Sequence, residues 1–398
     1  MVNINSWNKY EKKLNYIFEK VKDHYEKKGD KSNFVKLNEE QKNAVDTLVD
    51  NIENQKSVVA ATITSLLRKI IDPQQDIRYH QEGLRNPDGN KVGYSGRSLD
   101  TNVITPWLKK RFPRFAPKES GWLTRSIEQP HPFTKEFPGK IRNKKVKDAF
   151  LFILNDVEDN FVDSSSYLEY LLYRLLMKHE ANVNLVSKLH CELKDSLFTI
   201  DIVLNMLKEH FSTEQSSRLP VLAIYAIYSV FMKNIKIYED KILAPLREHT
   251  SPDKYEGFGD IEIYEIYNES KKRPFEIIEI KHGIPIDKTM IEDVLRKIEG
   301  TTIKKYYILT TAEPNFKDTN EEIFDSVHTA KIRYNVEVIP NGIYPTLKYY
   351  LRFIPDLKDF LDCYTQILKD EFEKSSNIKD CHIKSWSDIL KKYHSLEG

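Results

Sequence analysis

Two neighbouring segments with strand-like patterns constrain the fold of this chain most strongly. Residues 258–266 and 274–281 set isoleucines among charged residues, and a polar turn joins the two segments. Alternation with a period of two predicts β-strands, in which residues i and i+2 share one face. Glu279 and Lys281 therefore point the same way on the second strand, and Asp260 opens the first. The pair is predicted to gather two carboxylates and one ammonium group at a single point.

This grouping of charges suits a divalent metal ion. Adjacent antiparallel strands lie about 4.8 Å apart, so Asp260 can reach an ion that Glu279 also holds. Mg²⁺ accepts one or two carboxylates and fills its remaining positions with water and phosphate oxygens. We predict Asp260 and Glu279 as metal ligands and Asp260, Glu279 and Lys281 as the catalytic set for phosphodiester hydrolysis. The alternative is an exposed, salt-bridged hairpin, because 30% of the residues are charged and Glu-x-Lys is a common pattern.

The order of predicted elements indicates an α/β (α+β) fold with a mixed central sheet flanked by helices. After Tyr238 we expect, in order, a helix at 242–247, strands at 258–266 and 274–281, a helix at 286–298, a strand at 305–311, a helix at 320–332 and a strand at 336–339. No separate strand is expected before Phe258. The large N-terminal part is predicted to be mainly helical, and further helices are expected at 145–158, 165–178, 194–211, 219–233 and beyond 356.

Four regions follow from this order. We expect a helical and loop region at 1–150, a helical layer at 151–237, the core with the strand pair at 238–345, and C-terminal helices packed on that core at 346–398.

The strand pair resembles the PD-(D/E)XK nuclease superfamily, which includes most type II restriction endonucleases. The resemblance lies in the Asp that opens one strand, the Glu279-x-Lys281 on the next, and the helix and strand that follow, over about residues 238–340. It implies a restriction-endonuclease-like core with α-β-β-β-α-β order and Mg²⁺-dependent, site-specific cleavage of double-stranded DNA. It further implies a homodimer and a cognate DNA methyltransferase as functional partner. Gly259 stands where the family often has proline.

Other residues near the strand pair leave alternatives open. Glu239, Glu248 and Asp253 are candidates for an additional acid of the metal site, although Pro252-Asp253 favours a turn. His282 is favoured as a structural residue at a strand end.

The segment from Arg78 to Lys147 is strongly basic. It holds 16 basic and 6 acidic residues, a net charge of +10 in a chain whose total is +1. This concentration predicts contact with DNA. We expect guanine-edge contacts from the arginines and phosphate contacts from the lysines, in the set Arg97, Lys109, Lys110, Arg111, Arg114 and Arg125, with Lys144 and Lys145 as further phosphate contacts. The interleaved aromatic residues are favoured as the core of a small domain.

Several function classes lack support in the composition. The three cysteines, Cys191, Cys363 and Cys381, show no metal-binding or disulfide spacing. The longest apolar run, 219–232, is 14 residues long, short of the ~20 that span a bilayer. We therefore expect a cytoplasmic protein with no membrane partner. Two rival functions remain: a structure- or modification-dependent repair or antiphage nuclease of the same fold, and a DNA-binding module that does not cleave.

Overall fold

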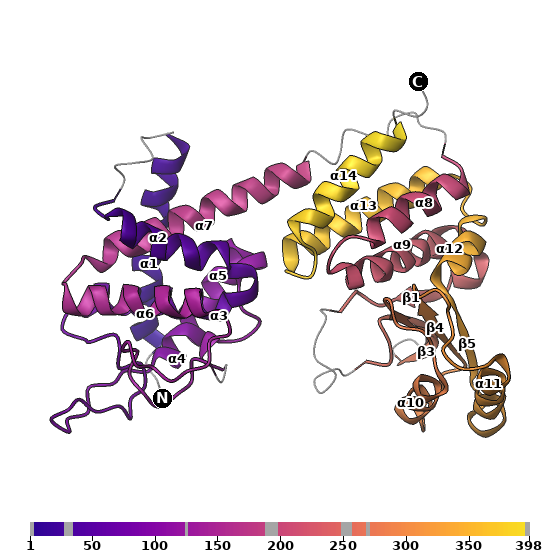
Figure 1. The fold of residues 1–398 in the computed structure, drawn as a ribbon, viewed down its shortest axis with the longest axis horizontal. Coiled ribbons are helices and arrows are strands. Elements are labelled where there is room, and N and C mark those ends of the chain that lie inside the picture. The colour runs from indigo at the N-terminus through magenta and orange to yellow at the C-terminus, as the bar shows by residue number, and fades with distance from the viewer. Residues whose placement is uncertain are drawn as a thin grey trace. The chain divides into compact units, whose positions relative to one another are not determined.

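The computed structural model describes residues 4–27, 35–123, 126–187, 198–247, 257–267 and 271–394. The chain forms two compact units, residues 1–184 and 185–398 (Figure 1). The helical layer expected at 151–237 is therefore divided between the units rather than forming a region of its own. The physical reason is packing, because Leu168, Leu171 and Leu175 belong to the core of the first unit.

The first unit is mainly helical, as expected. Its helices are α1 (Ile4–Glu26), α2 (Glu39–Asp50), α3 (Ile52–Ile71), α4 (Gly96–Leu99), α5 (Thr105–Arg111), α6 (Lys144–Asp159) and α7 (Ser164–Ser187), with a π-helical turn at Asp100–Ile104 and 3₁₀ turns at Pro113–Phe115 and Gly121–Leu123. The Asn38 side chain accepts a hydrogen bond from the Gln41 backbone, and the Gln41 side chain bonds back, which starts α2 with a capping box. Residues 58–67 of α3 are buried throughout, so α3 forms the centre of this unit.

Loops and short helices form the basic segment, and its aromatic residues are buried. Trp107, Phe112, Phe115, Trp122 and Phe133 all belong to the core of the first unit. Their interpretation as core residues is confirmed. An aromatic core of this kind lets a segment with little regular structure keep a defined shape.

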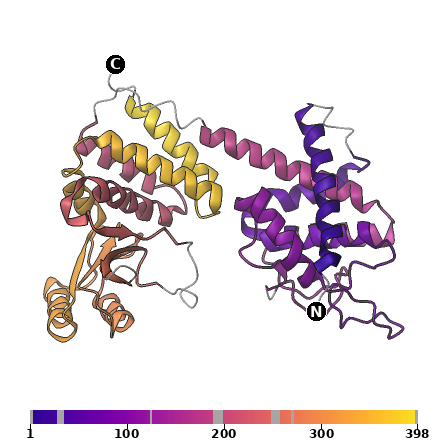
Figure 2. The same ribbon diagram turned by 180° about the vertical axis from the view of Figure 1, so that it is seen from behind.

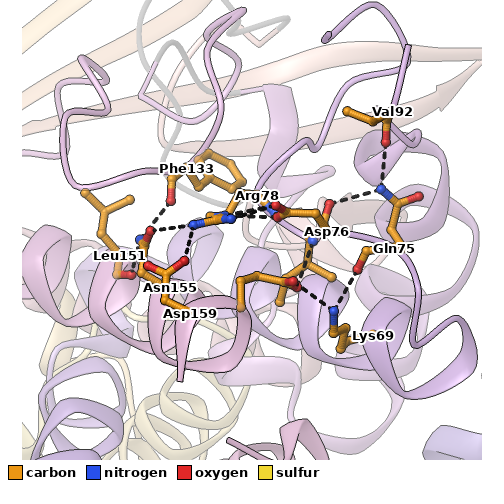
Figure 3. A network of polar contacts seen from close by, with 11 residues as sticks. Lys69, Gln75, Asp76, Arg78, Val92, Phe133, Leu151, Asn155 and Asp159 are labelled. Carbon is orange, nitrogen blue, oxygen red and sulfur yellow. Dashed lines mark hydrogen bonds and ion pairs between the residues drawn. The ribbon is translucent and has the colours of Figure 1, made fainter. Parts of the chain in front are cut away.

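A polar network attaches the start of this segment to helix α6 (Figure 3). The Arg78 guanidinium donates to both Asp76 oxygens, and its Nη1 donates to Asp159 Oδ1 at 2.7 Å. Asn155 donates to the Phe133 carbonyl at 3.0 Å. The hydrogen bonds and charges of Asp76 and Asp159 raise the pKa of Arg78. This cation therefore holds the segment in place.

The second unit contains a five-stranded mixed sheet in the order β1-β2-β3-β4-β5. The strands are β1 (Lys241–Leu243), β2 (Ile261–Tyr267), β3 (Lys271–Lys281), β4 (Lys305–Thr310) and β5 (Glu337–Gly342). The β1–β2 and β2–β3 pairs are antiparallel, and the β3–β4 and β4–β5 pairs are parallel. Helices α10 (Lys288–Ile298) and α11 (Asn320–Tyr334) connect the parallel strands, as a crossover requires.

Helices cover both faces of the sheet. Helices α10 and α11 share a core with Ile277 and Ile308 on one face. Ile278 and Ile280 face a second core formed with α8 (Ile200–Phe211), α9 (Leu219–Asn234), α12 (Ile343–Leu351), α13 (Leu357–Lys374) and α14 (Asp380–His394). Figures 1 and 2 show these two layers of helices on opposite sides of the strands. The expected mixed sheet flanked by helices is confirmed.

One predicted element is wrong. The sequence predicts a helix at 242–247, but Lys241–Leu243 form strand β1, whose Leu243 pairs with Ile263 of β2. Three residues are too few to show a period, so the hydrogen bonds of β2 decide their conformation. The sheet thus has a strand before Phe258, contrary to expectation.

The 3₁₀ turns Ser216–Arg218 and Lys236–Tyr238 flank α9. None of the helices described combines the length and apolar character needed to cross a membrane.

Candidate active site

The register of β2 and β3 brings the two predicted metal ligands together. Ile261 pairs with Ile278, so Asp260, one residue earlier, lies opposite Glu279. Asp260 Oδ2 accepts a hydrogen bond from the backbone N–H of Ile280 at 2.8 Å. Both carboxylates therefore occupy the face of the sheet that carries Ile277.

Gly259 determines how the chain enters β2. A Cβ atom at this position would lie 2.5 Å from Ile277 Cγ2 and 2.8 Å from the Ile278 carbonyl oxygen, closer than real side chains approach. The glycine therefore allows the chain to pass directly over β3. The neighbouring strand therefore occupies the space beside Gly259.

A tyrosine and a glutamate fix the segment before Asp260. The Tyr306 hydroxyl on β4 donates to the Phe258 carbonyl at 2.6 Å, and the Phe258 N–H donates to Glu262 Oε1 at 2.6 Å. Tyr306 is fully buried, and its hydroxyl also lies 3.5 Å from Glu279 Oε2. The Tyr306 hydroxyl thus contacts both Glu279 and the segment that precedes Asp260.

Two cations flank Glu279. Lys281 Nζ lies 2.7 Å from Glu279 Oε1, as the shared strand face predicted. Lys297 Nζ, on helix α10, lies 3.9 Å from Glu279 Oε2. The sequence reasoning missed Lys297 and Tyr306. The alternation in β4 shows which strand face Tyr306 occupies. It does not show the register of β4 against β3, which depends on tertiary contacts and brings Tyr306 near Glu279.

The electrostatics of the pair favour a bound cation. Burial raises the pKa of Asp260, and the negative charge of Glu279 raises it further. The Ile280 N–H and the charges of Lys281 and Arg218 act in the opposite direction. Two partly buried carboxylates that repel each other gain stability from a divalent ion between them. The residues present thus fit Mg²⁺ held by two carboxylates with water and phosphate in its other positions.

The structure adds no third acid to this pair among the residues it describes. Glu239 is exposed at the end of a 3₁₀ turn, and the described residues contain no group of three or more acids, histidines and cysteines with metal-binding geometry. Glu248 and Asp253 lie outside the described residues. Glu262 is buried and already accepts hydrogen bonds from Arg247 and Tyr264.

His282, which follows Lys281, has structural contacts. Its Nε2 lies 3.1 Å from the Ser216 hydroxyl and its Nδ1 lies 2.9 Å from the Thr311 hydroxyl. Burial lowers the pKa of His282. This arrangement agrees with the structural role favoured from the sequence.

The three predicted DNA-contacting arginines that the structure describes have carboxylate partners. Arg114 is only 3% exposed and pairs with Glu53 in the interior, so the prediction that its side chain contacts DNA is wrong. Arg97 pairs with Glu128 at 2.9 Å, and Arg111 pairs with Glu19 at 3.3 Å. Arg125 lies outside the described residues.

The predicted lysines are exposed. Lys109 donates to the Lys118 carbonyl at 2.6 Å, and Lys110 is exposed on the same short helix α5. At the start of α6, Lys144 and Lys145 are exposed together with Lys140 and Arg142 just before it. Within the described chain no ion pair joins these four side chains to a carboxylate. Exposed cations without a carboxylate partner are the kind of side chain that suits contact with phosphates.

No protein-family model matches the chain, and no curated protein has a significantly similar sequence.

Proposed function

We propose that this protein is a Mg²⁺-dependent endonuclease of double-stranded DNA, most like a type II restriction endonuclease. The observation that carries the proposal is the placement of Asp260 opposite Glu279, with Lys281 2.7 Å from Glu279. An exposed hairpin stabilised by salt bridges would not place two partly buried carboxylates opposite each other, where burial and the charge of Glu279 raise the pKa of Asp260.

The order of elements supports the same proposal. The chain runs α9-β1-β2-β3-α10-β4, which corresponds to the α-β-β-β-α-β core of the PD-(D/E)XK superfamily. Strand β1, which the sequence did not predict, supplies the strand that this order requires. The assignment to a restriction-endonuclease fold remains part of the proposal.

Each residue of the site has a role in this mechanism. Asp260 and Glu279 would hold Mg²⁺, which lowers the pKa of a bound water and neutralises charge on the phosphate. Lys281 would orient the attacking water and donate to the phosphate oxygens as negative charge develops there. Tyr306 would keep the two carboxylates at a fixed separation, and the exposed lysines of the basic segment would contact the DNA backbone.

The direct test is incubation of the purified protein with unmodified phage DNA, with Mg²⁺ or with a chelator. We expect discrete fragments only with Mg²⁺, and sequencing of their ends would give the recognition site. Intact DNA that is still bound would contradict the proposal in favour of a module that does not cleave. Cutting only of modified or branched DNA would favour a repair or antiphage nuclease. A homodimer and a partner methyltransferase, which the family resemblance implies, are part of the same proposal.

A further inference from the structure

Helix α11 carries an exposed apolar stripe on the side away from the sheet. Phe324, His328 and Ile332 are spaced four residues apart and therefore lie along one face of the helix. Phe324 is 66% exposed and Ile332 is 69% exposed, and the Phe324 ring stacks on His328 with centroids 5.9 Å apart. Ile323 and Ala330 on the other side of α11 are buried in the core with the sheet. Large apolar side chains exposed in a row commonly mark a protein contact.

We infer that this stripe is the contact surface between two copies of this chain. The stripe is symmetric about His328, so a two-fold axis through this residue pairs two antiparallel α11 helices. Phe324 of one copy then packs on Ile332 of the other. A two-fold contact requires such a self-complementary surface.

The charges beside the stripe have the same symmetry. Asp325 and Lys331 each lie three residues from His328, so the axis places Asp325 of one copy against Lys331 of the other. Both side chains belong to exposed residues. Lys331 also lies 3.4 Å from Glu337 of its own chain, but about half of each side chain is exposed. Exposed pairs of this kind contribute little, so Lys331 can exchange its partner.

The inference does not depend on nuclease activity. It is consistent with the proposed function, because cleavage of both DNA strands at a symmetric site needs two active centres. Helix α11 joins β4 to β5 in the unit that holds Asp260 and Glu279, so pairing through α11 joins two such units.

Sedimentation equilibrium without DNA or Mg²⁺ tests the contact. We expect the full-length protein to be a dimer and Ile332→Asp to weaken its association by at least about tenfold. Ile284→Asp is the matched control, because Ile284 is a 50% exposed isoleucine of the same unit outside α11. It should leave association unchanged. A monomeric wild-type protein, or a dimer that Ile332→Asp does not weaken, would overturn the inference.

A charge exchange tests the geometry. Asp325→Lys and Lys331→Asp alone should each weaken the dimer, because each places like charges across the axis. The double variant should restore association, while the circular dichroism spectra of both single variants should match that of the wild type. Additive weakening in the double variant would contradict the antiparallel pairing. Neither result depends on DNA cleavage, so failure of this inference is distinguishable from failure of the proposed function.

Discussion

One site in each unit shows a different arrangement of buried charges. In the first unit, each buried or half-buried arginine described above meets a carboxylate, as Arg114 meets Glu53 and Arg78 meets Asp76. In the second unit, Asp260 lies opposite another carboxylate, Glu279, and burial together with the negative charge of Glu279 raises the pKa of Asp260.

This difference separates structural from chemical roles. A neutralised ion pair holds distant parts of a chain together, whereas crowded like charges cost stability unless a ligand offsets them. We therefore propose that the arginine pairs of the first unit serve folding and that the acid pair of the second unit binds a metal ion.

The largest expected effect is on cleavage. Lys281→Met should lower the rate of DNA cleavage by about 10²–10⁴-fold, because it removes the cation placed next to Glu279. The measurement is a single-turnover cleavage assay. Lys272→Met, an exposed lysine on the same strand, is the matched control and should cleave like the wild type. Equal rates for both variants would contradict the role of Lys281.

The second prediction concerns Arg114 of the first unit. Arg114→Ala leaves Glu53 without its buried partner and should cost about 3–5 kcal/mol in the free energy of unfolding. Urea denaturation measures this. Lys110→Ala, on an exposed side chain, should leave the free energy of unfolding unchanged. If Arg114→Ala is as stable as the wild type, the interior ion pair has no structural role.

The third prediction concerns the exposed cations at the start of α6. Removing one cation that binds a phosphate should reduce the slope of log affinity against log salt by about 1. The double variant Lys144→Ala, Lys145→Ala should therefore lower this slope more than Arg97→Ala, because Arg97 already pairs with Glu128. Fluorescence anisotropy at several salt concentrations tests this order. A larger effect from Arg97→Ala would reverse the assignment of the contact surface.

The fourth prediction concerns Tyr306. Tyr306→Phe removes the hydrogen bond to the Phe258 carbonyl and should raise the Mg²⁺ concentration for half-maximal cleavage by several-fold. The absence of one hydrogen bond should cost about 1 kcal/mol in stability. Tyr307→Phe removes a hydroxyl from the next residue, on the other strand face, and should leave the Mg²⁺ dependence unchanged. Identical Mg²⁺ curves for all three proteins would show that Tyr306 only supports the fold.

The smallest effect is on stability without metal. The pKa of Asp260 is raised in the folded state, so the folded protein loses stability relative to the unfolded chain as pH rises above about 4. Asp260→Asn should therefore raise the thermal unfolding midpoint at pH 7, and the difference should vanish at low pH. Thermal unfolding at several pH values measures both. A variant less stable than the wild type at pH 7 would contradict the raised pKa.

The sequence predicted the placement of Glu279 beside Lys281 better than the exposure of the basic side chains, for a physical reason. The shared face of Glu279 and Lys281 follows from the geometry of one strand. By contrast, whether Arg114 is exposed depends on Glu53, 61 residues earlier, and no local pattern reveals that pairing. Strand β1 escaped prediction because its three residues depend on β2 for their hydrogen bonds.

We propose above all that Asp260 and Glu279 together hold a divalent ion. Mn²⁺ binding followed by electron paramagnetic resonance tests it directly, with Mg²⁺ as competitor. We expect one Mn²⁺ site in the wild-type protein that disappears in both Asp260→Asn and Glu279→Gln. It should persist in Glu265→Gln, a glutamate on β2 that pairs with Lys241 and Arg273. Unchanged Mn²⁺ binding in Asp260→Asn and Glu279→Gln would contradict the account.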